Sequence, residues 1–163
     1  MQISHDDLLM FIDRALDGML RIVEELGDER ANRCPALPGA NSPYAILTHC
    51  VGVTNYWIGV LLAQRYLPRD RDAEFRAQGT VDAIRRVVHT LQQQLREDIS
   101  HVRGEQPLVS APAAAYTPMH GCEGWTQGAA LLHAYEELAQ HHGQMEITRD
   151  MLMRESQAGS PAR

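Results

Sequence analysis

Glu137 and His141 lie four residues apart in residues 131–144, a segment that we predict to be helical. Residues four apart share one face of a helix and are separated by one turn. A carboxylate and an imidazole at this spacing could therefore bind one metal ion. His49, far upstream in a second predicted helix, supplies a third candidate ligand. Two ligands from one helix and one from another form a three-ligand site that leaves a coordination position for water or substrate.

His133 is a second candidate partner for Glu137, because it lies four residues before it. His133 and His141 are about 12 Å apart along a helix axis, so they cannot both bind one ion. The spacing leaves two alternatives, Glu137 with His141 or His133 with Glu137. Alone, such a histidine is more often a hydrogen-bonded core residue, and such a glutamate a solvated carboxylate. Their co-occurrence favours a metal, since a buried carboxylate needs a compensating partner.

Two neighbours of His141 on the same predicted helix, His142 and Gln144, differ in where they point. His142 points about 100° away from His141 around the helix, so we expect it to lie outside the ligand set. Gln144 lies one turn beyond His141 and could hydrogen-bond to a ligand or to substrate, or it could be a surface amide.

Apolar residues recur at helical spacing in four stretches, and no strand alternation is present. The predicted N-caps are Ser4, Ser42 and Thr80, and Gly27 is the predicted C-terminal stop of the first helix. The predicted helices cover residues of about 4–26, 43–61, 81–103 and 126–155. Four long helices with crossover loops predict an all-α four-helix bundle in one domain, residues 1–155, followed by a disordered tail at residues 156–163.

The connection at residues 104–124 is unusually long and contains Pro107, Pro112 and Pro118. Loops of this length are uncommon without a function. Two interpretations stay open: a lid over a substrate pocket, or a plain crossover that joins opposite ends of the bundle.

Composition excludes several classes of function. The formal net charge is −6 and lysine is absent, so a basic face for nucleic acid is not expected. The N-terminus is polar and acidic, and no apolar run approaches the length of a membrane span, so we expect a cytoplasmic protein. The three cysteines, Cys34, Cys50 and Cys122, form no CxxC motif, and we expect no disulfide framework. Cys50, next to His49, is expected to pack in the core.

Several segments resemble DinB-like proteins. Residues 41–49 (NSPYAILTH) and 55–59 (NYWIG) resemble their second helix, which carries a ligand histidine and a tryptophan two turns later. Residues 69–75 (RDRDAEF) resemble a segment that follows this helix in actinobacterial members. Residues 132–144 (LHAYEELAQHHGQ) resemble the motif of the last helix. The similarity spans most of residues 3 to 155 and implies a DinB-like four-helix bundle.

The resemblance also implies a ligand set. Many DinB-like proteins use three histidines, and aligning Gly143-Gln144 puts His141 at the second of the spaced pair and Glu137 at the first. The branch that includes maleylpyruvate isomerases and mycothiol transferases is similar in having glutamate and histidine at this spacing. The resemblance thus implies Glu137 and His141, rather than His133, with His49 completing the set. His142 stands where many relatives have arginine and Gln144 where several have histidine, which bears on the substrate.

The function that we expect is divalent-metal-dependent thiol transfer. The ligands suit Zn²⁺ first, with Ni²⁺, Fe²⁺ or Mn²⁺ as alternatives. A low-molecular-weight thiol, which the resemblance implies to be mycothiol, would occupy the open position, and its thiolate would attack an electrophile, either a xenobiotic or a metabolic intermediate. Arg69 and Arg71 are predicted to contact the thiol, and Gln144 and Arg149 to act at the reacting groups.

Two other functions stay open on the sequence alone. A metal-bound hydroxide would make the protein a hydrolase. A DinB-like bundle could also be a non-catalytic metal-binding protein of a stress response. Bundle relatives often dimerise, which adds a homodimer to the expectations.

Overall fold

The protein is an all-α bundle, as the sequence predicts. The computed structural model describes residues 3–113 and 124–158. Within these ranges no strand forms, and the only β-type pairing is an isolated bridge between Pro107 and Thr126. The elements are α1 (His5–Ala31), α2 (Pro43–Thr54), the π-helix η1 (Asn55–Val60), α3 (Arg71–Glu74), α4 (Val81–Ser100) and α5 (Gln127–Ala158).

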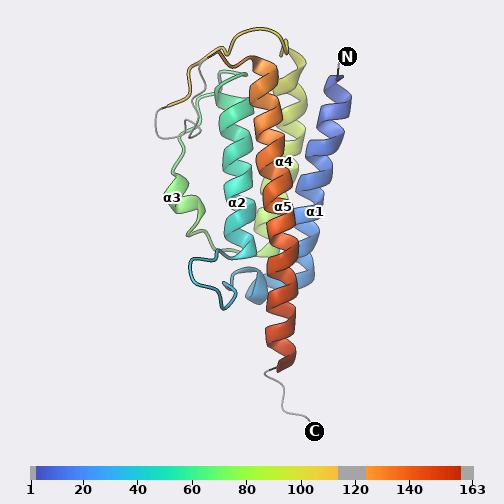
Figure 1. The fold of residues 1–163 in the computed structure, drawn as a ribbon, viewed down its shortest axis with the longest axis vertical. Coiled ribbons are helices and arrows are strands. Elements are labelled where there is room, and N and C mark those ends of the chain that lie inside the picture. The colour runs from blue at the N-terminus through green and yellow to red at the C-terminus, as the bar shows by residue number, and fades with distance from the viewer. Residues whose placement is uncertain (1–2, 114–123, 159–163) are drawn as a thin grey trace.

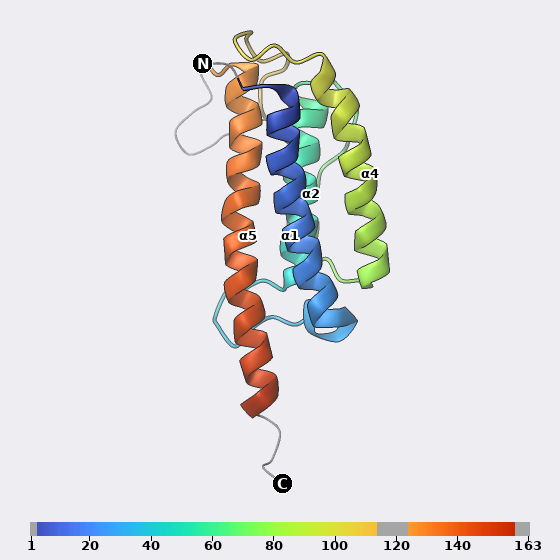
Figure 2. The ribbon, with the colours of Figure 1, turned by 90° about the vertical axis from the view of Figure 1, so that its right-hand side faces the viewer.

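Four long rods form the bundle: α1, α2 with its continuation η1, α4 and α5. Helix α1 packs against the other three, and α2 packs against α5 as well as α4. Helices α4 and α5 lie on opposite sides of α1 (Figure 2). Helices α1 and α5 run in one direction, and α2 and α4 run in the other (Figure 1). The two helices that carry the candidate ligands, α2 and α5, are therefore direct neighbours.

The helix starts follow from the capping residues. Each predicted N-cap hydroxyl accepts a hydrogen bond from the backbone N–H three residues on, which satisfies a donor that has no partner within the helix. The pairs are Ser4 with Asp7, Ser42 with Ala45, and Thr80 with Ala83. Pro43 occupies the first turn of α2, where its missing N–H costs nothing. These three predictions are confirmed.

Gly27 interrupts α1 with φ 68° and ψ 175°, a conformation that is essentially restricted to glycine. The regular helix ends there, as predicted, but a further turn continues to Ala31. At the other end of the chain, α5 reaches Ala158. The first three residues of the predicted tail are therefore helical, and residues 159–163 lie outside the described part.

The crossover connection is residues 61–80, which include α3, and not residues 104–124, for which a crossover was one of the two open interpretations. This segment runs along the outside of α2 and joins the ends of two parallel helices (Figure 1). The described residues of the 101–126 connection cross one end of the bundle, where α4 ends and α5 begins. The lid interpretation concerns mainly residues 114–123, which lie outside the described residues.

The π-helix η1 was not predicted. Arg65 folds back over it: its Nη2 donates to Asn55 Oδ1 at 2.9 Å and lies 2.8 Å from Oδ2 of the buried Asp98 on α4. A Cβ on Gly59 would lie 2.4 Å from Arg65 Nη2, so a larger residue there would force the Arg65 guanidinium to move. Trp57, inside η1, is buried and contacts His133 of α5 with 4.6 Å between the ring centroids.

The core is a single cluster of apolar side chains from all four rods. Cys50 belongs to it, as predicted, while Cys34 is exposed and Cys122 lies outside the described residues. The largest side chains that are fully buried are Ile12, Leu16, Met19, Ile46, Leu47, Ile58, Leu61, Leu95, Ile99, Leu138, Met145 and Leu152. Across the described residues, no helix combines the length and the apolar character needed to span a bilayer.

Replacing glycine by alanine at two positions tests this backbone. Gly27→Ala should lower the free energy of unfolding by about 1–3 kcal/mol, because φ 68° with ψ 175° is strained for any residue with a Cβ. Gly143→Ala should raise it by about 0.5–1 kcal/mol, because Gly143 lies inside α5 and a Cβ there meets nothing within 4 Å. Urea denaturation measures both. Equal effects of the two substitutions would contradict the assigned backbone.

Candidate metal centre

Three side chains converge between α2 and α5. His49 on α2 and Glu137 and His141 on α5 each offer a ligand-type atom, and these atoms all lie within 4.8 Å of one another. The imidazole centroids of His49 and His141 are 5.1 Å apart and the rings are nearly perpendicular. His49 is buried, whereas Glu137 and His141 keep about a third and a fifth of their side-chain surface exposed. The group therefore spans from the core toward solvent.

Both histidines are held by the nitrogen that faces away from the group. His49 Nδ1 donates to Glu74 Oε2 at 2.8 Å, and His141 Nδ1 donates to Gln144 Oε1 at 2.8 Å. A neutral imidazole has one N–H, so a hydrogen bond at Nδ1 leaves Nε2 with a free lone pair. His141 Nε2 indeed lies 3.7 Å from Glu137 Oε2. The Nε2 atoms are therefore the ones available to a cation.

The protonation states also suit a cation. Burial lowers the pKa of His49, against the hydrogen bond to Glu74, which raises it. Burial by itself raises the pKa of Glu74, but the hydrogen bonds from His49 and Arg69 outweigh it and leave that pKa lowered. A neutral His49 beside an ionised Glu74 is thus present at neutral pH, and metal ligands must be deprotonated. Burial raises the pKa of the Cys50 thiol well above neutral, so Cys50 does not offer a thiolate.

The spacing of the donor atoms fits a small divalent ion. Zinc binds nitrogen and oxygen at about 2.0–2.2 Å, so two ligand atoms at a tetrahedral angle lie about 3.4 Å apart. The 3.7 Å between Glu137 Oε2 and His141 Nε2 is close to this value and is too long for a direct hydrogen bond. His49, Glu137 and His141 could therefore hold a metal ion after a small contraction of the group.

His133 belongs to a different cluster. Its ring contacts Trp57 at 4.6 Å and Trp125 at 5.4 Å between centroids. Its Nε2 lies 3.9 Å from Glu137 Oε1, the oxygen on the other side from His141. Of the two alternatives that the spacing left open, the structure brings His49 together with Glu137 and His141. His133 instead joins an aromatic wall, defined here as Trp57, Trp125 and His133.

Arg69 and Arg71, predicted to bind the thiol, have other contacts in the structure. The Arg69 side chain is buried, and its guanidinium donates to both carboxylate oxygens of Glu74 at 2.8 and 3.0 Å. It also lies over the ring of Tyr56. Arg71 is exposed, with its guanidinium 5.1 Å from the ring centre of Phe75. A thiol contact by either residue stays a prediction.

Gln144 and Arg149 are placed differently with respect to the group. Gln144 accepts a hydrogen bond from His141, a candidate ligand, which is one of the contacts that its spacing allowed. Arg149 lies two turns beyond His141, bonded to Asp150 and 3.7 Å from Glu25 on α1. His142 lies against Gly18 of α1, away from His49.

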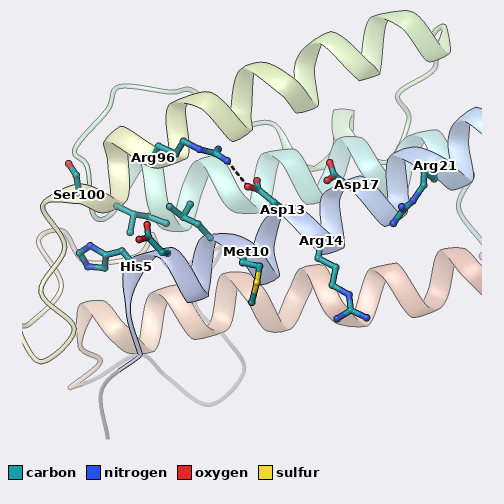
Figure 3. Close-up of a pocket in the computed structure, with 11 residues that line it drawn as sticks. His5, Met10, Asp13, Arg14, Asp17, Arg21, Arg96 and Ser100 are labelled. Atoms are coloured by element: carbon teal, nitrogen blue, oxygen red, sulfur yellow. Dashed lines mark hydrogen bonds and ion pairs between the residues drawn. The ribbon is translucent and has the colours of Figure 1, made fainter.

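A groove between α1 and α4 is separate from this group. It has a volume of about 940 Å³, and the Asp13–Arg96 ion pair at 2.8 Å crosses it (Figure 3). Charged side chains of both signs surround it, among them Arg14, Asp17 and Arg21. The described residues that line this groove include none from α2 or α5, so the groove is separate from His49, Glu137 and His141.

The fold and this group define a helical-bundle protein with a candidate site of two histidines and one glutamate. The model of the mycothiol-S-transferase family matches residues 7–153. The chain therefore belongs to the mycothiol-S-transferase family, a DinB-like family, as its motifs indicate. Among curated protein sequences, none matches the chain.

Two residues beside the site, Glu74 and Phe75, were not predicted from the sequence. Glu74 ends the four-residue helix α3 and Phe75 follows it, and the Phe75 ring stacks on the His49 ring at 4.2 Å. One signal for Glu74 is present in the sequence. Gly52 lies one turn after His49 and is the one glycine of α2, and it makes room for that carboxylate. The signal is weak, since a glycine in a helix has many explanations.

The assignment of ligands is tested by two histidine variants. His49→Ala should weaken Zn²⁺ binding by well over about tenfold, because even outer partners of metal ligands contribute about 10–100-fold. His133→Ala is the matched control and should bind Zn²⁺ as the parent protein does, because its ring lies against Trp57 and Trp125. Competition with a chromophoric chelator measures both affinities. A large loss in the His133 variant with little change in the His49 variant would contradict the assignment.

Proposed function

We propose that this protein is a divalent-metal-dependent thiol S-transferase that uses mycothiol in the cytoplasm. The convergence of His49, Glu137 and His141 in a chain of the mycothiol-S-transferase family carries the proposal. Zn²⁺ is the proposed metal, because two nitrogens and one oxygen with a free position suit it, and Ni²⁺, Fe²⁺ and Mn²⁺ are its competitors. A bound divalent cation would lower the pKa of a coordinated thiol and so supply a thiolate at neutral pH.

The residues of the chain have distinct parts in this proposal. His49 and His141 present Nε2, because Glu74 and Gln144 occupy their Nδ1 atoms. Glu137 adds a negative charge that offsets part of the charge of the cation. Gln144 is proposed to orient His141, so Gln144 would act through His141 and not by direct contact with the reacting atoms. Arg71, exposed on α3, is proposed to contact polar groups of the thiol, and Arg149 those of a larger substrate.

The aromatic wall is proposed to lie beside the electrophile. The ring centroids of Trp57 and Trp125 are 5.5 Å apart, and both rings contact His133. His133 Nε2 lies 3.9 Å from Glu137 Oε1. Trp57 is buried, and the partly exposed rings of Trp125 and His133 offer an apolar surface next to the proposed cation. Such a surface suits an electrophile with an aromatic or other apolar portion.

An aromatic chloride tests thiol transfer. With mycothiol and chlorodinitrobenzene, the thiolate sulfur should form a bond to the ring carbon as the C–Cl bond breaks and chloride leaves. We expect conjugation by the zinc-loaded protein and only the background rate for the chelated protein and for Glu137→Gln. Absorbance of the conjugate measures the rate. Hydrolysis of an ester without thiol would favour a hydrolase instead, and neither reaction, with no thiol-dependent shift in Tm, would favour a binding protein.

Metal removal is a separate test. The core is built from apolar residues of all four rods, so the metal-free protein should stay folded. At a metal concentration of 100 times Kd, binding adds about 2.7 kcal/mol, which corresponds to a rise in Tm of roughly 5–10 °C for a chain of this size. Circular dichroism during a thermal scan, with and without chelator, measures the shift and the helix content. A metal-free protein without helical signal would show that the site is structural.

A further inference from the structure

The segment that carries Glu74 holds His49 on two sides. Glu74 Oε2 accepts a hydrogen bond from His49 Nδ1 at 2.8 Å. The Phe75 ring stacks on the imidazole at 4.2 Å with an interplanar angle of 26°. Stacking on Phe75 fixes the plane of the His49 imidazole, and the hydrogen bond to Glu74 selects one of the two orientations related by a 180° flip about the Cβ–Cγ bond. These two contacts together leave one orientation for His49.

The space for this carboxylate is built into α2. A Cβ on Gly52 would lie 2.0 Å from Glu74 Oε1, so any larger residue would displace Glu74. Glu74 is 9% exposed, and the adjacent Arg69 guanidinium bonds to both of its oxygens. A buried carboxylate is costly unless it is paired and hydrogen-bonded, and here it has both kinds of partner. The space at Gly52 and the ion pair with Arg69 therefore hold the Glu74 carboxylate in one place beside His49.

An ionised carboxylate accepts hydrogen bonds and cannot donate them, so the proton of neutral His49 belongs on Nδ1. Nε2 then has a free lone pair, in a ring whose centroid lies 5.1 Å from that of His141 on α5. A negative group on the far nitrogen also raises the basicity of the imidazole toward a cation. Residues in this relation to metal ligands commonly change metal affinity by about 10–100-fold.

We propose that Glu74, held by Arg69, is a positioning residue that fixes the tautomer and orientation of His49 and so sets the affinity of the metal site. This inference rests on the proposed metal-dependent function. The alternative is that Glu74 only anchors the crossover connection, residues 61–80, to the bundle. In that case its loss would lower stability and leave the metal affinity of the folded protein unchanged.

Glu155 is a matched control for this alternative. It also fixes a connecting segment to a bundle helix, through an ion pair with Arg33 and a hydrogen bond from the backbone N–H of Ala36 at 2.9 Å. It lies near the C-terminal end of α5, about four turns beyond His141, and contacts no candidate ligand among the described residues. A substitution at either position therefore removes an anchor of a connecting segment, but only a substitution at Glu74 also removes a contact with His49.

The first experiment compares Zn²⁺ affinity, by competition with a chromophoric chelator, in variants checked for helix content. Glu74→Ala should bind Zn²⁺ about 10–100-fold more weakly than the parent protein. Glu74→Gln should fall between them, because its amide oxygen can still accept the Nδ1 proton but carries no charge. Glu155→Gln should be unchanged. Folded Glu74 variants that bind Zn²⁺ within about twofold of the parent would overturn the inference.

The second experiment needs no variant. Long-range ¹H–¹⁵N correlation spectra of the metal-free parent protein should show His49 protonated at Nδ1 and unprotonated at Nε2. An Nε2–H tautomer would overturn the inference even if every Glu74 variant failed to fold. The experiments also distinguish failure of the metal-dependent function from failure of the positioning role of Glu74. A parent protein that binds no Zn²⁺ contradicts the metal-dependent function, and the tautomer still decides whether Glu74 orients His49.

Discussion

Buried polar groups in this bundle must be satisfied, and that constraint organises the region between α2 and α5. Helix α2 is apolar around most of its circumference, so a histidine in its middle lies in the core. Once His49 is buried, one of its nitrogens needs an acceptor, and Glu74 is brought in by the crossover connection to provide it. Glu74 in turn needs a cation, which Arg69 supplies. The other nitrogen of His49 is left for the polar edge of α5, where Glu137 and His141 lie.

The same constraint explains why the proposed chemistry sits in this part of the bundle. A candidate ligand on a core helix, such as His49, is held in place by packing, whereas Glu137 and His141 on α5 are partly exposed and can be reached from solvent. A site with one ligand of the first kind and two of the second combines a fixed geometry with an open side. Membership of the mycothiol-S-transferase family agrees with a small-molecule thiol reaching this open side.

Much of the fold could be predicted from the sequence because its signals are local. The three N-cap hydroxyls, Pro43 and the helical spacing of apolar residues each act within a few residues. The pairing of Glu137 with His141 is local in the same sense, since a helix alone places them one turn apart. What the residues could not decide alone was His141 against His133. That choice depends on how far α2 is shifted along its axis relative to α5, which tertiary packing decides. Only the family resemblance favoured His141.

The features that escaped prediction are also tertiary. Arg65, whose side chain folds back over η1, reaches Asp98 on α4 across thirty-three positions of sequence. Glu74 reaches His49 across twenty-five positions and needs the recess at Gly52. The length of residues 104–124 left a lid and a crossover both open, but the direction of each helix decides which connection crosses. No local pattern specifies that direction.

Anomalous diffraction at the zinc absorption edge, on crystals of the zinc-loaded protein, tests the central claim most directly. We predict one strong peak per chain between α2 and α5, about 2.0–2.2 Å from Nε2 of His49, Nε2 of His141 and a carboxylate oxygen of Glu137. A peak bound by other residues, or the absence of any peak at this position, would contradict the proposed metal centre.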